Sequence, residues 1–418
     1  MKFKIKKEIL FNIILAIIFF ISAYHSVERK LDGNTFIITG SRFLAKDFLS
    51  LYKSLGTAPF TYTPQVSQFF SLFLIFGEKY AYSFLIFTNG LGLYLSLVIF
   101  YSIFSIHLRN RSLFFPLFLS LSAFSFIINE SFFIGQIDLF LLLPLSLFIF
   151  YMVNGNLIFA AFLLAFLIQF KPFFLILLLP VFIESLRSKN YKRSIHFYLP
   201  FLIFLFCFPL FFVLSTGISL EKYFVLFQQY INTSIGISNG FCCGSVSNSL
   251  KSILYNLFSS VPQSGRWYPY DYADIPNTHF FKIYLLDTRF IDSIYIVLTI
   301  SLFSFLLYLL LRSNSMIESI LITLAFVPTF SPVFWFAHLV YLIPVMFYLL
   351  IVNLSWDKLD KTPASVILFL AFVLVFHLIQ PSVLGGYLVD LFIIYGFYYG
   401  FTFVCITSFL FNMEKNLV

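Results

Sequence analysis

Long apolar runs separated by short polar breaks fill most of the chain. A transmembrane helix needs ~20 mostly apolar residues, and the runs predict about 12 such helices. We place them near residues 9–25, 80–106, 113–128, 137–153, 157–170, 172–186, 194–215, 290–311, 316–330, 335–353, 364–380 and 386–411. The pattern predicts an all-α polytopic membrane protein, one integral membrane domain over residues 1–418, with two large loops at 26–79 and 216–289.

The first apolar run follows a basic segment, residues 1–7, which is typical of a signal peptide or of a first transmembrane helix. No small-residue cleavage site follows His25, so we expect a retained helix. Residues 65–77 are too short to span a bilayer and carry several polar positions. They predict an amphipathic helix in the membrane interface, with a buried re-entrant segment as the alternative.

The runs 157–170 and 172–186 would each cover roughly 21–22 Å, against a hydrocarbon core of ~30 Å. Their joint, residues 169–172, would therefore lie below the membrane surface. Irregular backbone at that depth is tolerated only where protein buries it or where it lines a wet cavity. The joint predicts a cavity that opens on the non-cytoplasmic side.

Composition agrees with this pattern, since 60% of the residues are hydrophobic and only 11% are charged. So few charged groups could not cover a core of this size, which excludes a soluble globule. With the basic N-terminus in the cytoplasm, the short cytoplasmic segments carry the whole net charge of +8. We therefore expect both termini in the cytoplasm and both large loops outside it. The positive charge then needs no nucleic acid as a partner.

Metal and nucleotide chemistry have little support in the sequence. The 6 histidines show no paired ligand spacing, and Cys242 and Cys243 have no second cysteine pair near them. Those two cysteines predict a strained disulfide or two free thiols. Phosphate-binding and dinucleotide-binding glycine motifs are absent. We expect no metal site and no cofactor.

Polar residues of the non-cytoplasmic side gather in short clusters at helix ends. A charge at membrane depth costs about 2.5–3.5 kcal/mol or more, so each cluster calls for a physical reason. The clusters are Asp32, Tyr62-Thr63-Pro64, Gly135-Gln136-Ile137-Asp138, Lys171-Pro172 and the stretch Ser331-Pro332-Val333-Phe334-Trp335-Phe336-Ala337-His338.

Each charged member has a chemical interpretation and a structural one. Asp32 fits a general base that takes a proton from a hydroxyl, or a turn former beside Gly33. Asp138 fits a substrate ligand or a helix N-terminal cap. Lys171 fits a phosphate partner or a side chain that extends to the lipid headgroups. His338 fits a ligand of an anion or an interhelical hydrogen bond.

In their order and spacing, these clusters resemble glycosyltransferase family 87, which belongs to the type C membrane glycosyltransferases. The similar pieces are Asp32, Phe36, Gly40, Phe43-Leu44-Ala45-Lys46-Asp47, Pro59-Phe60-Thr61-Tyr62-Thr63-Pro64, Gly135-Gln136-Ile137-Asp138, Lys171-Pro172, Ser247-Asn248-Ser249-Leu250-Lys251 and residues 331–338. The last piece resembles the family's Ser-Pro-x-Ser-Trp-x-His-His. It departs from that pattern at Phe334 and Ala337, so only the second histidine is carried over, onto His338.

The resemblance implies an inverting sugar transfer from a polyprenyl-phosphate carrier, with mannose as the family's best-known donor sugar, to a glycan or glycolipid acceptor. It assigns the general base to Asp32, with Asp47 as the competitor. Lys171 and His338 would bind the donor phosphate. The substrate-binding residues would be Tyr62, Gln136, Asp138 and Trp335. The implied location is a bacterial-type inner membrane with the active site on its outer face, or an endoplasmic reticulum membrane with that face in the lumen.

A multi-span transporter or lipid flippase is the main alternative. Transporters built from inverted repeats show two similar halves with broken helices at matching positions. The Gly-Gln-Ile-Asp and Ser-Pro-x-x-Trp clusters have no counterpart in the other half of this chain. Polar clusters confined to one face also favour a one-sided enzyme site.

Overall fold

The structure is a computed structural model that describes residues 31–53, 60–107, 114–240, 249–259, 285–331, 334, 336–353, 400, 405–406 and 409. Within these residues the regular elements are helices, and the β pairing there is one isolated bridge between Ser259 and Leu286. This confirms the all-α prediction for the described part of the chain. The spans expected at 9–25 and 364–380, and most of 386–411, lie outside the described residues.

The chain divides into two compact units, each built from three segments. The first unit comprises Met1–Ile103, Ile127–Phe174 and Ile195–Ile235, and the second comprises Phe104–Phe126, Leu175–Ser194 and Gly236–Val418. Such units need not be separate domains, so a single domain over the whole chain stays a prediction.

Ten helical segments lie wholly or mainly in the first unit as the structure describes it. They are α2 (Leu31–Leu44), η1 (Phe48–Ser50), α3 (Val66–Ser71), η2 (Leu72–Phe76), α4 (Glu78–His107), α6 (Ser125–Ile134), α7 (Asp138–Val153), α8 (Leu157–Phe170), α10 (Tyr191–Thr216) and α11 (Leu220–Gly240). The remainder are α5 (Phe114–Ala123), η3 (Pro172–Leu177), α9 (Leu178–Ser188), α12 (Leu250–Phe258), α13 (Thr288–Arg312), α14 (Met316–Phe330), η4 (Phe336–Leu342) and α15 (Ile343–Asn353).

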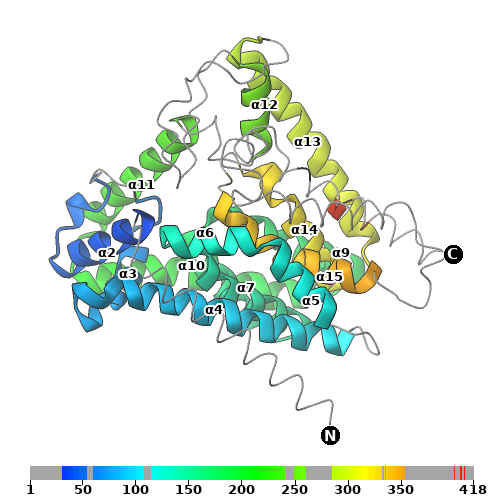
Figure 1. Ribbon diagram of the computed structural model, residues 1–418, viewed down its shortest axis with the longest axis horizontal. Helices are drawn as coiled ribbons and strands as arrows, with labels where there is room; N and C mark the ends of the chain where they lie inside the picture. Colours follow the sequence, from blue (N-terminus) through cyan, green and yellow to red (C-terminus); the bar gives the residue numbers. More distant parts are fainter. Residues whose placement is uncertain are drawn as a thin grey trace, which may run out of the picture. The chain divides into compact units, whose positions relative to one another are not determined.

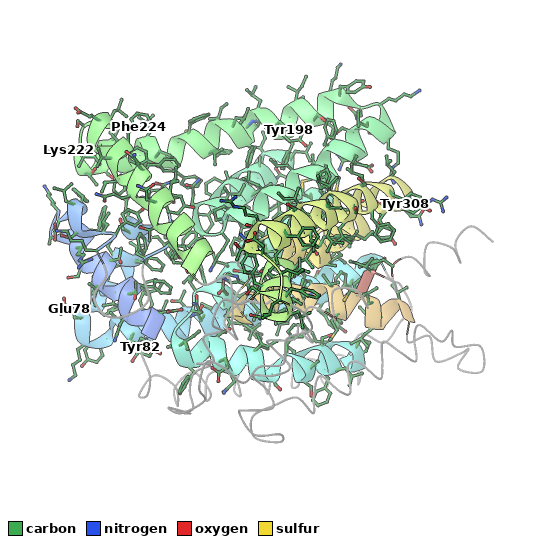
Figure 2. The ribbon with its side chains drawn as sticks, turned by 90° about the horizontal axis from the view of Figure 1, so that it is seen from above. Glu78, Tyr82, Tyr198, Lys222, Phe224 and Tyr308 are labelled. Carbon is green, nitrogen blue, oxygen red and sulfur yellow. The ribbon has the colours of Figure 1, made fainter. Side chains whose placement is uncertain are left out.

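Among the described residues, 3 helices are long and apolar enough to cross a membrane: Glu78–Ser105, Tyr191–Thr216 and Thr288–Arg312. They would number up to 4 if the bent pair Pro116–Ala123 and Ile127–Ile134 is one span. The other apolar helices are shorter, so the twelve predicted spans are not confirmed. Large apolar side chains on α10 are exposed, such as Phe206 at 70% and Leu214 at 72%. Figure 2 shows side chains projecting from this helix around the labelled Tyr198. Long helices with exposed apolar faces indicate a membrane-embedded protein.

The large loop predicted at 26–79 contains helices in the structure. Helix α2 packs against α3 (Figure 1), and a Cβ atom at Gly40 would come within 2.7 Å of the Phe70 carbonyl oxygen. Phe36 on α2 stacks on Phe70 with 4.4 Å between the ring centroids. The small residue and the flat ring let the two helices approach closely. A long loop with this many apolar residues therefore folds as part of the core.

The segment expected to be an amphipathic helix at 65–77 is helical, as α3 and η2. Ser67 and Ser71 are buried together with the apolar Phe70, whereas Ile75 and Phe76 at the end of the segment are exposed. Buried polar residues need hydrogen bonds, and Ser67 donates to the Pro64 carbonyl at 2.6 Å. The exposed apolar end suits a segment with lipid on its outer side.

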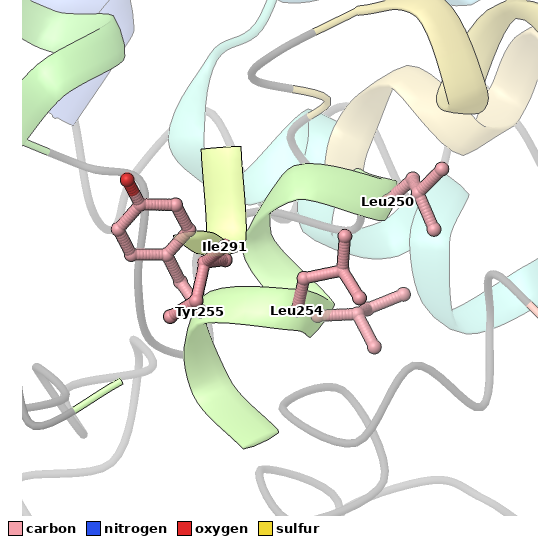
Figure 3. Packing of buried hydrophobic residues seen from close by; sticks show 5 residues of the cluster. Leu250, Leu254, Tyr255 and Ile291 are labelled. Atoms are coloured by element: carbon pink, nitrogen blue, oxygen red, sulfur yellow. The ribbon is translucent and has the colours of Figure 1, made fainter. Parts of the chain in front are cut away.

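In the second unit, α12 packs on the start of α13 through an apolar cluster centred on Leu250, Leu254, Tyr255 and Ile291 (Figure 3). Side-chain caps fix the ends of these helices. Ser249 accepts from the Ser252 amide at the start of α12, and Asp287 accepts from the Arg289 amide at the start of α13. The loop predicted at 216–289 thus also contains helices, α11 and α12.

Candidate functional site

The candidate site is built around the turn between α6 and α7. Gly135 has φ +72°, and the Gly135 amide bonds the Phe132 carbonyl at 3.2 Å while the Gln136 amide bonds the Ser131 carbonyl at 2.9 Å. These two bonds and the left-handed glycine form a Schellman motif, which ends α6. The glycine of the Gly-Gln pair is thereby explained, since it supplies the turn that ends α6. Gln136 is the next residue after this turn.

Gly135 also lets α2 approach the turn. A Cβ atom at Gly135 would lie 3.0 Å from the Gly33 Cα atom, and one at Gly33 would lie 2.5 Å from the Tyr82 ring. Figure 2 shows the labelled Tyr82 beside α2. Two glycines facing each other bring the neighbouring residues, Asp32 and Gln136, within reach of one another.

Asp32 and Gln136 form a buried hydrogen bond, in which the Gln136 amide nitrogen Nε2 donates to Oδ2 of Asp32. Asp32 is 8% exposed and Gln136 is 1% exposed. Burial raises the pKa of the Asp32 carboxyl to about 7, because removal from water disfavours the charged form. Lys171 lowers this pKa and Asp138 raises it. A carboxyl with a pKa near 7 can take up and release a proton at neutral pH.

Asp138, the first residue of α7, is fully buried and forms an ion pair with Lys171 at 3.3 Å. The Lys171 ammonium group also lies over the Tyr62 ring, 5.1 Å from its centroid. Lys171 is therefore held inside the protein and does not extend to the headgroups. A buried charge pair of this kind is stabilised by close geometry and by additional contacts such as this aromatic face.

The N-terminus of α7 receives its cap from another helix. Ile137 occupies the capping position and has no side-chain oxygen. Asn89, buried in the middle of α4, accepts from the Phe140 amide at 3.0 Å and donates to the Gln136 carbonyl at 2.6 Å. This arrangement satisfies one of the unpaired amides of the first helical turn. Of the two interpretations of Asp138 that the sequence left open, the helix cap does not apply, because Ile137 occupies that position, Asn89 bonds the first turn and Asp138 pairs with Lys171.

The segment that carries Tyr62 is tied to the end of α8. Thr63 donates to the Gln169 carbonyl at 3.0 Å, and Gln65 donates to the Gln169 side-chain oxygen. Tyr223 on α11 donates to Gln65 at 3.1 Å. Because Gln169 lies two residues before Lys171, this buried network fixes Lys171 and Tyr62 against each other. Helix α8 ends at Phe170 and η3 begins at Pro172, so the predicted break in the helix at Lys171 is present.

The structure thus brings five of the predicted site residues together: Asp32, Tyr62, Gln136, Asp138 and Lys171. Asp47, the alternative base, is exposed and precedes η1 without a capping hydrogen bond. His338 is buried in the second unit, where its ring lies 5.3 Å from that of Phe334. Trp335 lies outside the described residues. The roles of Trp335 and His338 therefore stay predictions.

The sequence prediction did not identify three hydrogen-bonding residues of this region, which are Asn89, Gln65 and Gln169. Asn89 is an amide within a long apolar run, and a polar group at such a position needs a partner. That signal marks the residue but does not identify what it binds. Among the described residues, no group of three or more histidine, cysteine or acidic side chains is arranged to hold a metal ion.

The arrangement combines a proton acceptor with a buried cation. Asp32 can accept a proton from a hydroxyl group, and Lys171 can stabilise negative charge that develops nearby. An anion bound to Lys171 would share it with Asp138. In comparisons with known proteins, no family model and no curated protein matches the chain.

Proposed function

We propose that this protein is a membrane glycosyltransferase that moves a sugar from a polyprenyl-phosphate carrier to an acceptor hydroxyl on the non-cytoplasmic face. The observation that supports this most is the buried Asp32, with a pKa near 7, beside the Lys171–Asp138 ion pair. The resemblance to glycosyltransferase family 87 supplies the reaction, and the site supplies groups suited to it. A lipid-embedded donor also fits a chain with long apolar helices.

In the proposed step, the acceptor oxygen attacks the anomeric carbon while its proton passes to Asp32. The new bond joins the acceptor oxygen to the sugar, and the bond between the anomeric carbon and the phosphate oxygen breaks. The electron pair leaves with the polyprenyl phosphate, whose growing charge Lys171 would stabilise. Attack from the side opposite the phosphate inverts the anomeric centre. Tyr62, Gln136 and Asp138 would position the sugar or the acceptor.

The test is transfer by the purified full-length protein from radiolabelled polyprenyl-phosphate mannose to a mixture of glycan and glycolipid acceptors. Losing a general base costs about 10²–10⁴ in rate, so Asp32→Asn should abolish detectable transfer. Asp47→Asn is the matched control, because Asp47 is an exposed carboxylate on the same segment, and it should retain wild-type transfer. Both variants are checked for folding by gel filtration and thermal melting.

Two outcomes would contradict the proposal. Asp32→Asn with at least half of the wild-type rate would remove the general base from this residue. Absence of transfer from every polyprenyl-phosphate sugar would reject the glycosyltransferase, and a flux assay for a transporter or lipid flippase would be the next experiment.

A further inference from the structure

The Gln136 side chain contains a buried polar atom that the proposed proton transfer does not use. Its oxygen Oε1 is fully buried and has no hydrogen-bond partner in the part of the chain that the structure describes. Leaving such an acceptor unpaired costs about 1–3 kcal/mol. Buried polar groups without a protein partner call for an explanation, such as a ligand or an ordered water molecule.

The orientation of this side chain is fixed by chemistry. In the ionised form that acts as the base, the Asp32 carboxylate only accepts hydrogen bonds, so the amide nitrogen of Gln136 faces it. The oxygen shares its carbon atom with that nitrogen and therefore stands beside the carboxylate. It can only accept, so its partner must be a donor such as a hydroxyl. A phosphate oxygen, which accepts as well, does not fit there.

The hydrogen-bonding network keeps the side chain in this place. Asn89 holds the Gln136 carbonyl at 2.6 Å, and the Gln136 amide is bonded within the Schellman motif. With its backbone held in place, Gln136 cannot turn its oxygen toward another partner without breaking the bond from Nε2 to Asp32.

We propose that Gln136 Oε1 accepts a hydrogen bond from a second hydroxyl of the acceptor, next to the hydroxyl that Asp32 deprotonates. The acceptor class is then a compound with two neighbouring hydroxyl groups, as on a sugar ring, and a lipid alcohol or amino-acid side chain with a single hydroxyl is disfavoured. This inference rests on the proposed function, since it concerns the acceptor of that reaction. It makes Gln136 a residue that determines specificity.

The experiment compares a methyl hexopyranoside with its series of monodeoxy derivatives and with a long-chain alcohol that has one hydroxyl. Transfer is measured as kcat/KM, and binding without donor is measured by the thermal shift of the full-length protein in detergent. Sites built to bond a hydroxyl reject analogues that lack it by large factors. We expect the parent glycoside to exceed the long-chain alcohol, and one deoxy derivative with its reacting hydroxyl intact to lose at least about tenfold in kcat/KM.

Gln136→Met keeps a similar length but removes both the oxygen and the Nε2 donor to Asp32. The diagnostic readout is therefore the ratio of kcat/KM values, and the variant should remove the difference between the parent glycoside and the sensitive deoxy derivative. If Gln136→Met fails to fold, the deoxy series on the wild-type protein still decides the question. The inference would be overturned if kcat/KM were the same for the parent glycoside, for the alcohol and for every deoxy derivative with an intact reacting hydroxyl. The partner of Oε1 would then be a water molecule. If no sugar donor reacts but the glycoside still binds and one deoxy derivative does not, the proposed function fails and the two-hydroxyl site stands.

Discussion

At the scale of single residues, Asp32 links the stability of the protein to pH. Burial raises the pKa of its carboxyl to about 7 in the folded protein, from its ordinary value of 3.8. Between these two values the folded state binds more protons than the unfolded state, so rising pH destabilises the fold. The stabilising effect of the protonated carboxyl is complete below about pH 4 and is lost as pH rises through about 7.

Asp32→Asn should therefore melt at a higher temperature than the wild type at pH 8, by about 2 °C or more. The asparagine oxygen can still accept the Gln136 hydrogen bond, whereas the charge is removed. The difference should shrink as pH falls from 8 to 5. Thermal melting in detergent at several pH values measures it, with the exposed Asp47→Asn as the control that should show no such trend. A constant difference at all pH values would mean that the Asp32 carboxyl does not titrate in this range.

The residues of the site could be predicted from sequence only in part. Asp32, Asp138 and Lys171 are charges in an apolar chain, and their cost draws attention to them. The pairing of Asp138 with Lys171 and of Asp32 with Gln136 depends on where α2, α7 and α8 approach one another. That approach is set by glycine contacts between residues far apart in the chain, which no local pattern contains.

At the scale of helices, apolar runs predicted several boundaries closely. The runs expected at 157–170 and 316–330 are α8 and α14, with those bounds. The run expected at 113–128 instead forms parts of two helices, α5 and α6. Helices α2 and α11 were missed because their mixed polar and apolar sequences lack the long apolar signal of a span. Long loops seldom remain without secondary structure in a compact protein.

Asn89 should be the most sensitive polar residue of α4. Asn89→Leu has a similar size but leaves the Gln136 carbonyl and the Phe140 amide without their partner. Each such loss costs about 1–3 kcal/mol, so we expect a marked fall in melting temperature. Ser96→Ala is the matched control, since Ser96 is equally buried on α4 but donates to the Gly92 carbonyl of its own helix. Similar effects of the two substitutions would show that Asn89 does not cap α7.

At the scale of the whole molecule, α10 relates the site to the membrane. With 26 residues it is about 39 Å long, more than the ~30 Å hydrocarbon core, so its ends should reach opposite faces. Lys189, Lys192 and Arg193 lie at or beside its N-terminal end, which the positive-inside rule assigns to the cytoplasm. At its other end, Phe212 packs with Tyr223 of α11, and Tyr223 bonds Gln65 in the network beside Tyr62.

The site should consequently open on the face away from the cytoplasm, which a labelling experiment can measure. In a variant without the 4 native cysteines, Lys192→Cys and Glu221→Cys place single thiols at exposed positions near opposite ends of α10. A membrane-impermeant maleimide added to intact cells should label Glu221→Cys, and it should label Lys192→Cys only after the membrane is opened. Lys222 and Phe224 follow Glu221 on the outer side of α11 (Figure 2), so the attached label meets little crowding there. Labelling of both thiols in intact cells would mean that α10 does not span the membrane. The reverse order would turn the Asp32 site toward the cytoplasm, where nucleotide sugars are available and a lipid-linked donor would lose its physical rationale.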